Sequence, residues 1–214
     1  MATTGSTNED GGTMAITTIA DLVRVHARTR PDRPALTAGD ATWTFSELDA
    51  RSNRVAQALA ADAVESQDRV AFLGKNSPEF FEVMLGAAKL DAVTVAVNWR
   101  LAAPEVAYVL NDARAKLLVV GSEFASVIAA IEHELITVRK VIVVGEPGPH
   151  ESFAAWMATA RPQDPGIEAT PEAVALQLYT SGTTGRPKGA LLTNRNLSAM
   201  LPGTSQDWGF DGDS

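Results

Sequence analysis

The chain has 214 residues, of which 45% are hydrophobic and 21% are charged, a composition typical of a globular protein with one large or two small domains. Its net charge of −8 disfavours nucleic acid or an anionic membrane as a partner. The sequence contains no cysteine, which excludes disulfides and cysteine-based metal sites and agrees with a cytoplasmic location. No apolar run approaches the length of a transmembrane segment.

The amino-terminal residues 1–13 are rich in Thr, Gly, Asn and Asp and lack the basic and apolar regions of a signal peptide. We expect a disordered tail here. Met14 begins the first patterned segment and is an alternative start of translation.

Helical and strand patterns alternate from residue 17 to residue 144. Thr17 or Thr18 can cap a first helix, a turn at Gly39-Asp40 joins two short strands at 35–37 and 42–44, and Ser46 can cap the next helix. The following elements are expected as strands at 68–73, 92–97, 116–120 and 141–144, and as helices from Ser77-Pro78, over 104–111 and around 124–134. This repetition predicts an α/β fold with a mostly parallel sheet flanked by helices.

The segment from Gly145 to Pro171 is rich in proline, which indicates a connection with one short helix over 152–160. It separates no second domain. After it come two apolar runs at 174–179 and 190–192, and between them lie the eight residues 181–188, which cannot pack a core.

These eight residues comprise three hydroxyl side chains, two glycines, a proline and two cations. Glycine lets the backbone approach a ligand closely, and successive N–H groups with hydroxyls and a lysine attract an anion. The pattern predicts a strand–loop–strand that holds phosphate, with a flexible surface hairpin as the alternative. A Walker-type kinase or GTPase is disfavoured, because Pro187 stands five residues after Gly182 where that motif has glycine.

The eleven residues from Tyr179 to Gly189 resemble the phosphate-binding signature of the adenylate-forming superfamily, which comprises acyl-CoA synthetases, peptide-synthetase adenylation domains and luciferases. The resemblance implies an ATP-dependent acid–thiol ligase. In such enzymes a carboxylate attacks the α-phosphorus of ATP to give an acyl-adenylate and pyrophosphate, and coenzyme A then displaces AMP. Mg²⁺ would accompany ATP, with its ligand expected in a part of the protein that this chain lacks.

The same resemblance assigns roles within the loop. Lys188 would be the catalytic cation that stabilises the departing pyrophosphate, Arg186 would face solvent, Pro187 would stiffen the loop, and Gly189 would let the chain turn. The ATP-binding set implied by the signature is Thr180, Ser181, Gly182, Thr183, Thr184, Gly185, Lys188 and Gly189.

The residues Asn98 to Leu101 resemble the fatty-acyl-CoA synthetase branch, so a fatty acid is the expected substrate. An aryl-CoA ligase and a peptide-synthetase adenylation domain are the alternatives. The chain departs from the family pattern at Asp91, where glycine is usual, at Ala96, where proline is usual, and at Asn194, where histidine is commoner. The departures at Asp91 and Ala96 concern backbone shape more than chemistry.

The three histidines, His26, His133 and His150, are scattered without ligand spacing, and no metal site is expected from them. The superfamily's later motifs are not found. We therefore expect residues 14–214 to be a partial amino-terminal AMP-binding domain, truncated and inactive alone. The alternative is a native short product, a non-catalytic remnant that binds phosphate, nucleotide or another protein.

Overall fold

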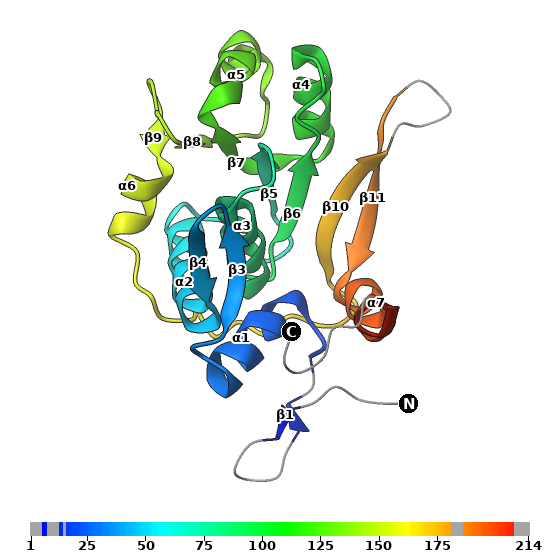
Figure 1. Ribbon diagram of the computed structural model, residues 1–214. Coiled ribbons are helices and arrows are strands. Elements are labelled where there is room, and N and C mark those ends of the chain that lie inside the picture. Colours follow the sequence, from blue (N-terminus) through cyan, green and yellow to red (C-terminus); the bar gives the residue numbers. More distant parts are fainter. Residues whose placement is uncertain (1–5, 8–12, 15, 181–185, 208–214) are drawn as a thin grey trace.

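The computed structural model describes residues 6–7, 13–14, 16–180 and 186–207 (Figure 1). A central sheet lies between two layers of helices. Its strand order is β11-β10-β6-β5-β7-β8-β9, and every neighbouring pair is parallel except β10 and β11, which form an antiparallel hairpin. The strands are β5 (Arg69–Leu73), β6 (Val93–Val97), β7 (Ala115–Gly121), β8 (Lys140–Val144), β9 (Glu151–Ser152), β10 (Val174–Thr180) and β11 (Lys188–Thr193). The predicted α/β fold is confirmed.

Helices cover both faces of this sheet. They are α1 (Ile19–Thr29), α2 (Phe45–Ala61), α3 (Pro78–Lys89), α4 (Ala103–Asp112), α5 (Ala125–Ile131), α6 (Phe153–Ala158) and α7 (Asn194–Asp207), with 3₁₀ turns at Ser122–Phe124 and Glu132–Glu134. On one face Val55 of α2 and Val83 of α3 pack with Phe72, and on the other Val109 of α4 packs with Leu118 (Figure 1). The central strands are apolar on both sides because both sides are covered.

Two smaller sheets stand apart from the main one. The hairpin predicted around Gly39-Asp40 is present as β3 (Pro34–Ala38) and β4 (Ala41–Thr44). Near the amino terminus β1 (Ser6–Thr7) pairs with β2 (Thr13–Met14). The other residues of the segment 1–13 lie outside the described ranges, so the disordered tail stays a prediction.

Two of the expected helix caps differ in the structure, at α2 and at α3, where Ser77 precedes the helix without a capping hydrogen bond from its side chain. Thr18 caps α1 and Ser152 caps α6, each accepting a backbone N–H in its helix. Ser46, however, does not cap α2, because the helix begins one residue earlier. Thr44 is the cap, and it forms a reciprocal capping box with Glu47.

Two of the departures from the family pattern have local explanations. Asp91 has φ +55°, a left-handed conformation in which glycine costs least, and its carboxylate accepts hydrogen bonds from Ser66 Oγ (2.6 Å) and Gln67 Nε2 (3.2 Å). Asn194 is 3% exposed. Its side chain accepts from the backbone N of Ile19 (3.1 Å) and donates to the carbonyl of Thr170 (3.1 Å). Asn194 therefore joins two backbone segments, whereas the Asp91 carboxylate binds two side chains that precede β5.

A buried ammonium group joins α2, α3 and the segment that leads to β10. The side chain of Lys89 is 0% exposed, and its Nζ lies 2.6 Å from Asp49 Oδ1 and 3.8 Å from Asp164 Oδ2. It also donates to Asn53 Oδ1. Asp164 in turn accepts from Arg24 Nε and Nη2, both at 2.7 Å. Burial lowers the pKa of Lys89, and the carboxylate of Asp49 opposes that effect.

We predict that Lys89→Met lowers the free energy of unfolding by about 3–5 kcal/mol, because it leaves the half-buried carboxyl groups of Asp49 and Asp164 and the buried amide of Asn53 without their cation. Chemical denaturation at pH 7 measures this. The matched control is Lys75→Met, at an exposed lysine. Equal losses in the two variants would contradict a structural role for the buried network.

Candidate functional site

The predicted phosphate loop connects β10 to β11 at the carboxyl edge of the parallel strands. Thr180 pairs with Lys188 across the hairpin, and Tyr179 pairs with Gly189. Because β10 runs parallel to β6, the loop leaves the sheet at the edge where β5, β6, β7 and β8 also end (Figure 1). Open α/β sheets bind their ligands at this edge.

Part of the predicted site lies outside the described residues, namely Ser181, Gly182, Thr183, Thr184 and Gly185. Their roles stay predictions. Thr180 and Lys188 are both exposed at the two ends of the loop. Within the described part of the chain the side chain of Lys188 has no carboxylate partner, so its ammonium group is available to an anionic ligand.

Helix α4 holds the second end of the loop. The Tyr108 hydroxyl donates to the carbonyl of Pro187 at 3.2 Å, and the guanidinium of Arg186 lies 5.8 Å from the centre of the Tyr108 ring. Arg186 is exposed, as the sequence indicated. Tyr108 was not anticipated, because it is 79 residues away from Pro187 in the chain.

The sequence suggested that Gly189 lets the chain turn, but the structure has no turn at this residue. Gly189 lies inside β11, and its φ is not positive. A Cβ atom at this position would lie 2.5 Å from Gln177 Nε2 and 3.2 Å from Tyr179 Cζ. Glycine is therefore needed for close approach of side chains from β10, and its proposed contact with ATP is untested.

Those side chains form a short hydrogen-bonded chain beside the loop. The Tyr179 hydroxyl donates to Asp112 Oδ2 at 2.6 Å, and Gln177 Nε2 donates to the Tyr179 oxygen at 3.1 Å. Burial, together with the carboxylate of Asp112, raises the pKa of Tyr179, so the phenol stays neutral. These two hydrogen bonds fix β10 to the end of α4.

The residues 98–101, whose pattern resembles that of fatty-acyl-CoA synthetases, lie at the same edge, directly after β6. Asn98 Oδ1 accepts from the backbone N of Arg100 at 3.0 Å, and the Arg100 guanidinium stacks 4.0 Å from the centre of the Trp99 ring. Trp99 packs against the core under α4 and α5. This arrangement brings a second cation to the edge that carries Lys188.

The described residues at the carboxyl edge include exposed cations. They present an unpaired lysine at the carboxyl edge, but no group of three or more His, Asp or Glu side chains among them could hold a metal ion. Within the same ranges, no helix combines the length and apolar character needed to cross a bilayer.

Comparison with known proteins extends these observations. The model of a family described as AMP-binding enzyme matches residues 23–213. The chain is 39% identical over 195 residues to a fatty acid–[acyl-carrier-protein] ligase, ScoC, of Streptomyces coeruleorubidus, covering 89% of the chain and 36% of that protein. It is 39% identical to a 3-hydroxybenzoate–CoA ligase of Aromatoleum sp. (strain CIB), covering 75% of the chain and 31% of that protein.

Among solved structures, the anthranilate-CoA ligase AuaEII in complex with anthranoyl-AMP superimposes with a TM-score of 0.82 at 30% identity, covering 91% of this chain and 37% of that one. The chain thus spans about a third of the length of the curated relatives that it matches.

We predict that Gly189→Ala lowers the free energy of unfolding by about 1–3 kcal/mol, because the added methyl group displaces the Gln177 amide and breaks its bond to Tyr179. Thermal and chemical denaturation measure the loss. Ala190→Ser, at the exposed neighbouring position, is the control and should change stability by less than about 0.5 kcal/mol. A neutral Gly189→Ala would show that the hairpin adjusts without strain.

Proposed function

Because the chain belongs to the AMP-binding enzyme family, we propose that it forms the amino-terminal part of an ATP-dependent acid–thiol ligase. The observation that carries the proposal is the signature from Tyr179 to Gly189, set between β10 and β11 at the carboxyl edge of the sheet. The relatives support it, because those named above are ligases that join an acid to coenzyme A or to a carrier protein.

In the proposed reaction a carboxylate oxygen of the acid attacks the α-phosphorus of ATP. The bond between the α-phosphorus and the bridging oxygen breaks, giving an acyl-adenylate and pyrophosphate. The thiol of coenzyme A then attacks the acyl carbon, loses its proton and releases AMP. Positioned donors and cations account for most catalysis of such phosphorus chemistry, because the attack and departure redistribute charge over phosphate oxygens.

We propose that Lys188 places its ammonium group against the β- and γ-phosphates and stabilises pyrophosphate as it leaves. Thr180 would donate its hydroxyl from the other end of the loop. Ser181, Gly182, Thr183, Thr184 and Gly185 complete the proposed ATP-binding set, with Gly189 next to Lys188. Mg²⁺ would enter with the ATP phosphates and take its protein ligands from a segment beyond residue 214.

The acid itself is a further proposal. The Asn98–Leu101 pattern and the similarity to ScoC favour a fatty acid. The similarity to the 3-hydroxybenzoate and anthranilate ligases favours an aryl acid as the second candidate. A chain that binds ATP without adenylating an acid would instead be a nucleotide-binding remnant.

We predict that Lys188→Ala lowers acid-dependent exchange of pyrophosphate into ATP by about 100-fold or more in the protein that contains this chain, because a charged donor to the leaving group is lost. Arg186→Ala, at the neighbouring exposed cation, is the matched control and should keep most of the activity. Equal losses in the two variants would show that Lys188 has no special role.

The acid is identified by the same exchange assay with a panel of fatty acids, hydroxybenzoates and amino acids. We expect fatty acids to give the highest kcat/KM. A higher value for hydroxybenzoates would overturn the fatty-acid assignment and leave the ligase proposal intact. Binding of ATP with no exchange for any acid would support the remnant.

A further inference from the structure

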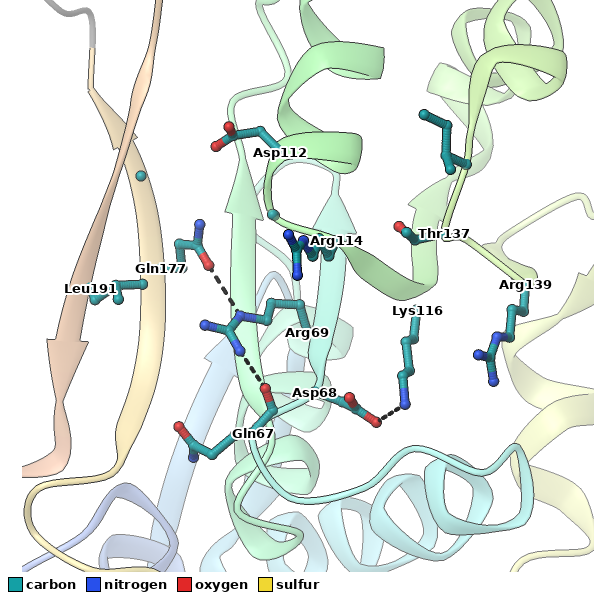
Figure 2. Close-up of a pocket in the computed structure, with 13 residues that line it drawn as sticks. Gln67, Asp68, Arg69, Asp112, Arg114, Lys116, Thr137, Arg139, Gln177 and Leu191 are labelled. Atoms are coloured by element: carbon teal, nitrogen blue, oxygen red, sulfur yellow. Dashed lines mark hydrogen bonds and ion pairs between the residues drawn. The ribbon is translucent and has the colours of Figure 1, made fainter.

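A second group of cations lies at the amino ends of the parallel strands, away from the carboxyl edge where Lys188 lies. A pocket of about 790 Å³ opens there between the end of α4 and the hairpin of β10 and β11 (Figure 2). Its cationic lining residues are Arg69, Arg114, Lys116 and Arg139. The lining is basic, because these four cations face two carboxylates, Asp68 and Asp112, in a chain whose net charge is −8.

The carboxylates of this pocket are already engaged. Asp68 pairs with Lys116 at 2.5 Å, and Asp112 accepts the Tyr179 hydroxyl. Arg69 donates to the carbonyl of Gln67 at 2.5 Å and more weakly to Gln177 Oε1 at 3.4 Å (Figure 2).

Two guanidinium groups remain without a counter-ion. Arg114 and Arg139 are exposed, and within the described ranges neither side chain has a hydrogen bond or an ion pair. Like charges gathered in one hollow repel one another, so an anion that enters it gains from all of them.

The backbone of Arg114 is itself unusual. Arg114 follows the carboxyl-terminal cap of α4 and has φ +55°, in the left-handed region where a helix commonly places glycine. An arginine at this position costs conformational energy that glycine would avoid. This strained backbone position puts the Arg114 guanidinium group at the rim of the pocket, as expected where backbone strain serves a binding site.

The spacing of the cations indicates the size of the ligand. Arg69 begins β5, Arg114 and Lys116 flank the start of β7, and Arg139 precedes β8, with β5, β7 and β8 adjacent in the sheet. Neighbouring strands lie about 4.8 Å apart, so the group spans about 10 Å. That width exceeds one phosphate group. One guanidinium group can donate two parallel hydrogen bonds to two oxygen atoms of one phosphate group, which favours phosphate over other anions.

We propose that this pocket binds a small molecule with two or more linked phosphate groups, held by Arg114 and Arg139 together with Arg69, at a site separate from the predicted phosphate loop. The ligand bridges the amino ends of β5, β7 and β8 and neutralises cations that the protein leaves unpaired.

Isothermal titration of the chain with tripolyphosphate tests the proposal, with inorganic phosphate and citrate as comparison anions. Arg114→Gln/Arg139→Gln should weaken tripolyphosphate binding by about 100-fold, about 10-fold for each guanidinium group removed. Arg161→Gln, at an exposed arginine outside the pocket, is the matched control and should bind as the unsubstituted chain does. Lys188→Ala, which removes the cation of the predicted phosphate loop, should keep the part of the tripolyphosphate binding that the two arginine substitutions abolish.

Arg114→Gly separates binding from folding. Since glycine relieves the left-handed backbone, this variant should unfold at no lower denaturant concentration than the unsubstituted chain and yet bind tripolyphosphate about 10-fold more weakly. Unchanged binding in the arginine variants, or its complete loss in Lys188→Ala, would overturn the proposal. Citrate binding as tight as that of tripolyphosphate would also overturn it, since the pocket would then be a general anion trap.

Discussion

The burial of the Lys89 ammonium group is the constraint on which the position of the candidate site depends. An ammonium without water is tolerated only when oxygen atoms replace the water, and here Asp49, Asn53 and Asp164 supply them. Asp49 and Asn53 belong to α2, but Asp164 lies on the connection between α6 and β10. The buried charge thus fixes to the helices a segment that has little apolar surface of its own.

Further side chains of α2 hold the same connection. Arg54 donates to the carbonyl of Ala160 at 2.6 Å, Asn53 to that of Pro162 at 2.9 Å and Gln57 to that of Gln163 at 2.9 Å. These bonds satisfy carbonyl groups that no strand partner reaches. They hold residues 160–163 of the connection against α2. The chain then continues to β10, which pairs with β6 and ends at the carboxyl edge.

The sheet keeps two groups of cationic side chains apart, one at each end of its strands. Its interior is apolar on both faces, so charged groups are confined to the strand termini, where water can reach them. Lys188 and Arg100 gather at the carboxyl edge, and Arg69, Arg114 and Arg139 gather at the amino edge. The hydrogen-bonded chain of Gln177, Tyr179 and Asp112 lies between these groups and fixes the hairpin to α4.

The sequence by itself determined the α/β class, the order of the main elements and the position of the predicted phosphate loop between two strands, because hydrophobic periodicity, turn residues and the signature at 179–189 are local patterns. It placed the cap of α2 two residues too late, at Ser46 instead of Thr44, and wrongly predicted a turn at Gly189, since capping competition and side-chain crowding depend on neighbours. Only the tertiary structure decided which distant residues meet. Tyr108 reaches Pro187, Asp164 reaches Lys89, and the three arginines of the basic pocket converge from the starts of three strands, because parallel pairing aligns strand ends that the sequence keeps tens of residues apart.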